Sequence, residues 1–346
     1  MKEGMRFPLK KIAVICRRAP DPAHSSGELR FYQLIMLLKK KCKKLVVFTE
    51  RQTKAESKLK GCDLFPLKDL KRNLAGVELG FIEFWFMGKT IPAFRERRIP
   101  VILDSVDVEF VRRKREARFI KPVSFDKTAE LRNYKKADLV LVVSEEDRSA
   151  IRRYCRRIEI IPNIHRPSGK VNGFNRRRGI CFVGSYRHMP NVDGLRWYKK
   201  AIMPFVKEFD HVFIGYNAPK EIKQLKGFIG GVEDARQYVQ NARVSIAPLR
   251  YGAGLKGKVG ESLACGTPVV TTPVGAEGFR ATHKKNIWIA RNEKEFIEGI
   301  CRLYNDPKAW LRISREGLRL SKGLTPQKAE CRLERVISLL LKQCLR

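Results

Sequence analysis

The sequence has no long apolar run. No stretch of about 18 consecutive apolar residues occurs in its 346 residues, and a membrane-spanning helix needs one of roughly that length. Near the N-terminus the only apolar stretch is residues 12–16. That is too short for the core of a secretion signal, and a buried strand is the better interpretation. We therefore expect a cytoplasmic location.

Paired cysteines are also missing. The nine cysteines are scattered, and none belongs to a Cys-x-x-Cys pair. This spacing argues against a disulfide framework and against a zinc site. We expect reduced thiols, with Cys16, Cys181 and Cys265 buried in apolar surroundings.

Acidic residues are scarce relative to basic ones. The chain has 36 Asp and Glu against 72 Lys and Arg, a net charge of +36, and the excess is spread over both halves. Two explanations stay open: a generally basic proteome, or attraction to anionic lipid or a polyanionic acceptor. The basic runs 39–44 and 112–118 are candidates for peripheral contact with an anionic membrane face. Aromatic-plus-basic recognition motifs are absent, so no nucleic-acid partner is expected.

The most informative stretch covers residues 245–279. An apolar run, Val244–Leu249, leads into a glycine loop at 251–254, and a helical segment, Lys256–Ala264, ends before Gly266. A second short apolar strand follows at 268–272. In a strand–loop–helix–strand unit the loop lies at the carboxyl end of the sheet, where free amides and the positive end of the helix dipole favour phosphate.

Strands alternate with helices along the whole chain, which predicts doubly wound, largely parallel α/β sheets. A polar, basic stretch at 166–178 separates two such series. The sequence therefore predicts an N-terminal domain over 1–165, a linker over 166–178 and a C-terminal domain over 179–325. In the N-terminal series the predicted strands cover 12–16, 45–48, 79–87, 101–104 and 138–143.

The stretch 245–279 resembles the donor-nucleotide loop of family 4 glycosyltransferases (glycosyl transferases group 1), which are retaining enzymes of the GT-B fold. The resemblance is strongest over residues 179–279 and extends over nearly the whole chain. It implies two Rossmann-like domains facing each other across a cleft, with a C-terminal helix at 326–346 that crosses back to the N-terminal domain. The matching positions are Leu249, Arg250, Gly252–Gly254, Lys256, Lys258, Val259, Glu261, Ala264, Gly266, Pro268–Val270, Thr272 and Gly275–Gly278.

The resemblance also implies a set of donor-binding residues. Oriented amides, a helix dipole and cations would stabilise the departing diphosphate without an obligatory metal or cofactor. Lys256, at the helix N-terminus, and Glu261, the expected ribose ligand, are the catalytic candidates. Many family members carry a second Glu eight positions earlier, where this chain has Ala253. The donor-binding set is Gly184, Ser185, Arg187, Gly231, Val232, Gly252, Ala253, Gly254, Leu255, Lys256 and Glu261.

Four residues of the N-terminal half are candidates for acceptor binding: Gly27, Glu28, Asp104 and Asp107. Gly27 and Glu28 resemble the family loop after the first strand. Asp104 and Asp107 follow a predicted strand where many members have a histidine, and either could bind a sugar hydroxyl or act as a base. Alternative roles stay open, because Glu28 and the two aspartates could equally stabilise helix N-termini.

The resemblance implies a retaining, hexosyltransferase-type glycosyltransferase (EC 2.4). Such an enzyme moves a sugar from a nucleoside-diphosphate donor to a hydroxyl of a glycan or lipid-linked saccharide, as in polysaccharide biosynthesis. Two alternatives remain. One is a non-catalytic protein of the same fold that binds nucleotide sugars or polyanions. The other is a nucleotide-sugar epimerase.

Overall fold

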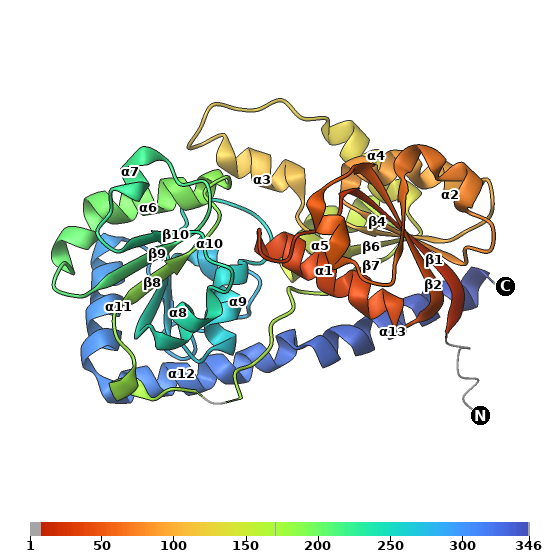
Figure 1. Cartoon of the computed structure of the whole chain (residues 1–346). Coiled ribbons are helices and arrows are strands. Elements are labelled where there is room, and N and C mark those ends of the chain that lie inside the picture. Colours follow the sequence, from red (N-terminus) through yellow and green to blue (C-terminus); the bar gives the residue numbers. More distant parts are fainter. Residues whose placement is uncertain (1–7, 170, 345–346) are drawn as a thin grey trace.

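Two parallel β-sheets organise the chain (Figure 1). The computed structural model describes residues 8–169 and 171–344. Helices cover both faces of each sheet, and the strand orders require crossover connections of the doubly wound type. The predicted architecture of two doubly wound α/β domains is confirmed. No helix within the described ranges is long and apolar enough to cross a membrane.

The N-terminal sheet has seven strands in the order β3-β2-β1-β4-β5-β6-β7. Its apolar strands are buried on both faces, as parallel sheets require. The strands are β1 (Leu9–Arg18), β2 (Cys42–Arg51), β3 (Asp63–Pro66), β4 (Leu79–Glu83), β5 (Val101–Asp104), β6 (Leu139–Val142) and β7 (Ile158–Ile160). The α-helices among them are α1 (Ser26–Lys39), α2 (Ile91–Arg95), α3 (Glu109–Glu116), α4 (Lys127–Lys136) and α5 (Glu145–Ile151).

The C-terminal sheet has six strands in the order β10-β9-β8-β11-β12-β13. They are β8 (Ile180–Val183), β9 (His211–Ile214), β10 (Phe228–Gly230), β11 (Val244–Ala247), β12 (Val269–Thr271) and β13 (Trp288–Ile289). The helices are α6 (Met189–Ala201), α7 (Lys220–Lys223), α8 (Arg236–Asn241), α9 (Gly257–Ala264), α10 (Pro273–Ala276), α11 (Glu293–Asn305), α12 (Pro307–Ser321) and α13 (Pro326–Cys344).

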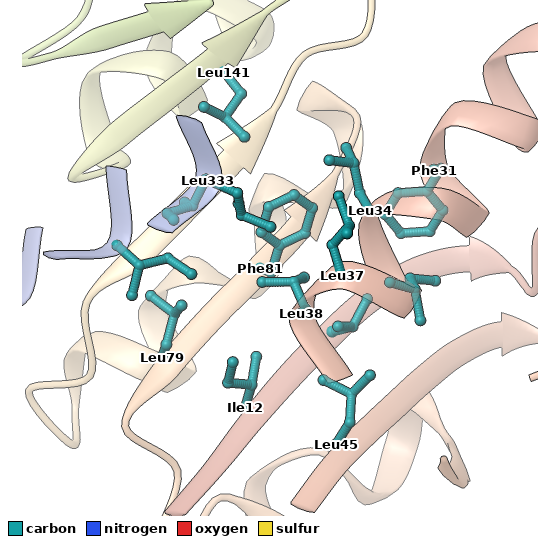
Figure 2. Packing of buried hydrophobic residues seen from close by; sticks show 14 of the residues in the cluster. Ile12, Phe31, Leu34, Leu37, Leu38, Leu45, Leu79, Phe81, Leu141 and Leu333 are labelled. Carbon is teal, nitrogen blue, oxygen red and sulfur yellow. The ribbon is translucent and has the colours of Figure 1, made fainter. Parts of the chain in front are cut away.

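Helix α13 leaves the C-terminal domain and packs on the N-terminal one (Figure 1). Its Leu333 lies in the same buried cluster as Phe81 of β4 and Leu38 of α1 (Figure 2). At the edge of this contact, Lys41 Nζ lies 2.8 Å from the carboxylate of Glu330. The two domains are therefore joined by α13 as well as by the connection between β7 and β8.

The predicted strand over 79–87 is too long. It ends at Glu83 because Phe84 adopts φ +63°, a conformation that no β-strand accepts. A 3₁₀ segment, Trp85–Thr90, follows. The basic run 39–44 is also divided, since α1 ends at Lys39 and β2 begins at Cys42. The short edge strand β3 had no clear apolar alternation and was not predicted.

Glycines line the face on which the C-terminal domain meets the N-terminal domain. A Cβ on Gly257 would lie 2.2 Å from Cβ of Ser26, and one on Gly260 would lie 2.3 Å from Nε2 of His165. A Cβ on Gly254 would lie 3.3 Å from Cβ of Asp107. Side chains at these positions would collide with the other domain or with the segment that follows β7. The absence of Cβ atoms therefore sets how closely the cleft closes.

This geometry predicts that Gly257→Ala separates the domains. Gly257 lies in α9 and has helical backbone angles that alanine also adopts. The clash of the new Cβ with Ser26 is therefore the main destabilising effect of the substitution. Overpacking of this kind costs roughly 1–3 kcal/mol. Small-angle scattering should show a larger radius of gyration for the variant than for the wild type.

Gly323→Ala provides the matched control, because nothing lies within 4 Å of a Cβ at that position. The account of closure is wrong if Gly257→Ala and Gly323→Ala leave the radius of gyration equally unchanged.

Candidate functional site

The candidate site lies where β8 and β11, adjacent central strands of the C-terminal sheet, end beside the N-terminal domain. The chain leaves β8 toward β9 and leaves β11 toward β12, on opposite sides of this pair. The strand order therefore reverses here, which is where open α/β sheets bind their ligands. Three segments meet at this edge: residues 184–188 after β8, residues 248–256 after β11, and the start of α9.

The N-terminus of α9 has no side-chain cap. Lys256 occupies the N-cap position and provides no capping oxygen. Within the described part of the chain, the amides of Gly257 and Lys258 also have no hydrogen-bond acceptor. Two unsatisfied donors at the positive end of a helix form a binding site for an anion.

Lys258 points from α9 toward the loop after β8. Its Nζ donates to Oδ1 of Asn191, lies 4.3 Å from the centre of the Phe182 ring, and would be 3.1 Å from a Cβ on Gly184. Burial, and then the charge of Lys256, lower the pKa of Lys258 to about 7. An anion bound beside it would stabilise the charged form.

Lys256 faces the opposite side of the glycine loop. Its Nζ donates to the carbonyl of Gly254 at 2.6 Å and lies 3.6 Å from Oε2 of Glu277. Arg115 of α3 makes two hydrogen bonds to the same Glu277, at 2.7 and 2.8 Å, and donates to the carbonyl of Gly252 at 2.8 Å. Burial lowers the pKa of Lys256 and Glu277 opposes that shift. Lys256 thus fixes the loop between the domains.

Glu261 lies on α9, and both of its oxygens are engaged. Oε2 lies 2.8 Å from Nδ1 of His165, and Oε1 accepts a hydrogen bond from Arg236. Burial alone would raise the pKa of Glu261, but His165 and Arg236 reverse the shift and lower it. Arg236 begins α8, directly after the loop of Gly231 and Val232. The structure therefore brings Glu261 close to the predicted base-binding loop.

Several contributors to this region were missed from the sequence. Tyr216, which follows β9, packs on Gly231 and donates to the carbonyl of Val232 at 3.1 Å. Asn191 donates to the carbonyl of Ser185 at 2.7 Å and thereby holds the loop after β8. The aromatic character of Tyr216 at a strand end was the available signal. The partners of Asn191 could not be identified from spacing.

Arg187 and His188 lie in the exposed loop after β8. Arg187 Nη1 approaches Nε2 of His24, in the loop before α1, to 3.5 Å. Desolvation lowers the pKa of His188 even though its side chain is solvent-accessible, and the nearby cations Lys258, Arg112 and Lys256 act in the same direction.

The four acceptor candidates occupy different surroundings. Asp104 is fully buried, and both of its oxygens accept hydrogen bonds from Arg30, at 2.5 and 3.0 Å. Because Asp104 is 0% exposed and paired with Arg30, an acceptor cannot reach it, so we remove Asp104 from the acceptor-binding set. Asp107 instead faces Gly254 across the cleft. Burial raises the pKa of Asp107, and Arg112 opposes that shift.

Gly27 and Glu28 lie at the start of α1. A Cβ on Gly27 would meet nothing closer than 3.9 Å. The carboxylate of Glu28 is engaged locally, by Arg18 at 2.7 Å and by Nδ1 of His24 at 2.5 Å. Glu28 therefore shapes the loop between β1 and α1, whose His24 approaches Arg187.

Asp147 adds a buried carboxyl group to the cleft. It accepts a hydrogen bond from Ser144, the N-cap of α5, and is 4% exposed. Burial raises the pKa of Asp147 to about 6, and Asp107 contributes in the same direction. The described residues include no group of three or more His, Cys, Asp or Glu arranged to hold a metal ion.

Both basic runs are largely occupied by internal partners. In α3, Arg112 and Arg113 pair with Glu109 and Glu116, and Arg115 pairs with Glu277. Lys41 pairs with Glu330 and Glu334, and Lys44 with Asp63. Less charge is available for an anionic membrane face than the sequence suggests, and membrane contact stays a prediction.

Comparisons with known proteins agree with this fold. Residues 177–306 match the model of the glycosyl transferases group 1, so the resemblance to that group is confirmed over these residues. In a search of curated protein sequences, the chain has no match.

Solved structures match the whole chain. Sucrose-phosphate synthase from Thermosynechococcus elongatus is 15% identical with a TM-score of 0.71, covering 96% of this chain and 100% of that one. Anabaena HepE in complex with UDP and glucose is 13% identical with a TM-score of 0.73 and the same coverage. An apo structure of OtsA is 11% identical with a TM-score of 0.62, covering 96% and 99%. The fold is GT-B.

The environment of Asp147 predicts that Asp147→Asn stabilises the protein at neutral pH. In the unfolded chain Asp147 ionises at about pH 4, whereas in the folded protein its pKa is about 6. The folded state therefore loses stability relative to the unfolded state as pH rises from about 4 to about 6. A shift of this size corresponds to about 3 kcal/mol. The variant should gain thermal stability at pH 7.5 and little at pH 4. Asn can still accept the Ser144 hydrogen bond.

Glu145→Gln, in the same helical turn but exposed, is the control. The difference in thermal stability between Glu145→Gln and wild type should be the same at pH 4 and at pH 7.5. A gain by Asp147→Asn that is the same at pH 4 and pH 7.5 contradicts the assignment.

Proposed function

We propose that the protein is a glycosyltransferase that moves a sugar from a nucleoside diphosphate to an acceptor hydroxyl, with retention of anomeric configuration. The observation that carries the proposal is the uncapped start of α9, with Lys258 between it and the loop after β8. Two free amides and a cation converge on one position at the carboxyl edge of the sheet. That arrangement is suited to the diphosphate that must depart.

The nucleoside would extend from this position toward α8. Glu261, the loop of Gly231 and Val232, and Tyr216 lie on that side. In this orientation Glu261 accepts hydrogen bonds from ribose hydroxyls. Arg236 would release Oε1 of Glu261 for this purpose. Backbone groups of the loop receive the base, so the residues do not specify which base it is. HepE has been solved with UDP-glucose, which makes UDP sugars the first donors to test.

The sugar would then lie over the glycine loop, where Ala253 replaces the acidic residue of many family members. Two carboxylates from elsewhere in the fold reach this region. Glu277 lies within 3.6 Å of Lys256, and Asp107 faces Gly254. We infer that Asp107, beside the glycine loop, is the residue that contacts the acceptor hydroxyl, since it comes from the N-terminal domain and Asp104 is fully buried. Arg112 Nε lies 3.0 Å from Oδ2 of Asp107, so Oδ1 would make this contact. No metal or cofactor is required for this scheme.

The second candidate is a protein that binds nucleotide sugars without transferring the sugar. Only Ala253, which replaces the glutamate of many family members, favours it. A panel of UDP-, GDP-, ADP- and dTDP-glucose separates the two. Thermal shift measures binding, and release of the nucleoside diphosphate measures turnover with water or an added acceptor. The proposal expects one donor to bind and to be hydrolysed. Binding without any hydrolysis or transfer supports the second candidate, and failure of every donor to bind contradicts both.

Protonation of Lys258 predicts how donor affinity changes with pH. Only the charged amine attracts the diphosphate, and its pKa is about 7 in the free protein. Affinity for a nucleoside diphosphate should therefore fall as pH rises from 6 to 8.5, by about tenfold in all. Titration calorimetry measures the slope.

Lys258→Met should bind about tenfold more weakly at pH 6. Comparing the two proteins removes the contribution of the ligand's own phosphate, whose second pKa is about 6. Equal affinity and an equal pH slope in both proteins would remove Lys258 from the donor site.

A further inference from the structure

A cavity of about 630 Å³ lies on the other side of the glycine loop from Lys258. Both domains line it. Arg115, Arg118 and Phe119 come from α3 and the residues after it, and Arg250, Tyr251 and Arg280 come from the C-terminal domain. Helix α3 reaches from the N-terminal domain toward α10 (Figure 1). The position proposed above for the diphosphate, beside Lys258, lies outside this cavity.

The charge of the lining is positive. Four arginines face two carboxylates, Glu146 and Glu277. Arg115 is neutralised by Glu277, and Arg250 by Asp193. Among the described residues, Arg118 and Arg280 have no ion-pair partner, and both are exposed. Glu146 offsets one of these two positive charges, so the cavity retains an excess of positive charge that suits an anionic group.

Arg280 is held in an uncommon backbone conformation. Its φ is +51°, a left-handed value that costs energy for a residue other than glycine. It follows the segment of Glu277 and Gly278, which contacts the N-terminal domain. Strain of this kind concentrates at ligand sites.

An aromatic pair forms one wall. The rings of Phe119 and Tyr251 stack with centroids 4.8 Å apart and an interplanar angle of 18°. Phe119 is 40% exposed although the guanidinium of Arg250 lies 5.2 Å from the centre of its ring, so part of its apolar surface remains accessible to a ligand. Tyr251 is 1% exposed, yet its hydroxyl has no hydrogen-bond partner in the described part of the chain. Burial raises the pKa of Tyr251 to about 12.

The position of the cavity indicates what it holds. Tyr251 immediately precedes Gly252, whose carbonyl accepts a hydrogen bond from Arg115. A molecule seated in the cavity therefore ends beside the glycine loop. The donor diphosphate already has a position at the start of α9, across that loop. The remaining substrate of a sugar transfer is the acceptor.

We propose that this cavity binds an acidic sugar acceptor, with its phosphate or carboxylate group at Arg118 and Arg280 and its sugar ring against Phe119. A sugar phosphate and a sugar carboxylate share the same chemistry here, which is one anionic group attached to a polar ring. The proposal rests on the function proposed above, because it assigns the second substrate of the same reaction.

The test uses the double variant Arg118→Gln/Arg280→Gln in the full-length protein. Calorimetry with glucose 6-phosphate, glucuronate and uncharged glucose, in the presence of a saturating nucleoside diphosphate, distinguishes phosphate, carboxylate and no charge. Wild type should bind at least one of the two acids about tenfold more tightly than glucose, and the double variant should lose that preference. The matched control is Arg152→Gln/Arg153→Gln, which removes the same charge from an exposed N-terminal site and should retain the preference.

Affinity for the nucleoside diphosphate, measured on the same proteins without sugar, separates the two proposals. It should be equal in all three, since Arg118 and Arg280 lie outside the donor site. Absent diphosphate binding in wild type would overturn the proposed function. Intact diphosphate binding with no preference for either acid, or with a preference that survives in the double variant, would overturn the acceptor assignment.

Discussion

The close approach of the two domains across a row of glycines is the constraint on which the site depends. Gly254, Gly257 and Gly260 bring the backbone of the C-terminal domain to Asp107, Ser26 and His165. Any Cβ at Gly257 or Gly260 would force the cleft open. The ion pair from Arg115 to Glu277 and the bond from Asn163 to the carbonyl of Leu255, 2.9 Å long, form only in this closed arrangement. The glycines thus permit closure, and polar contacts hold it.

Charge is distributed unevenly around that contact. Lys256 and Arg115 both contact Glu277, so each of them has a carboxylate partner within the protein. Lys258 has only a neutral amide and an aromatic ring as partners among the described residues. A buried amine without a carboxylate is unfavourable in isolation, which is why its pKa falls to about 7. A diphosphate would supply the missing counter-charge, and this difference separates the two lysines by role.

Local chemistry made much of the fold predictable. Gly266 takes φ +64° after α9, and Ser144 caps α5 through Asp147, both from signals that lie within a few residues. Alternating strands and helices were sufficient for two doubly wound domains. The end of β4 was not predictable, because the positive φ of Phe84 leaves no trace in an apolar run.

The site was less accessible from the sequence, because its partners are distant along the chain. Lys256 and Lys258 are two residues apart, so α9 presents them on different sides, and only the packing of α9 decides which one meets the loop after β8. Asp104 and Asp107 are similar in the sequence, yet Arg30 occupies the first and leaves the second in the cleft. His165, Arg236 and Arg115 reach the site from other elements, and no spacing rule identifies them.

If a nucleoside diphosphate binds between the start of α9 and the loop after β8, it should protect the amides there. Hydrogen–deuterium exchange of the wild-type protein can be measured with and without UDP, GDP, ADP and dTDP. At least one of the four should slow exchange in peptides covering residues 184–188 and 252–261. If none of them protects these peptides, or if protection is confined to other segments, the diphosphate does not bind at this position.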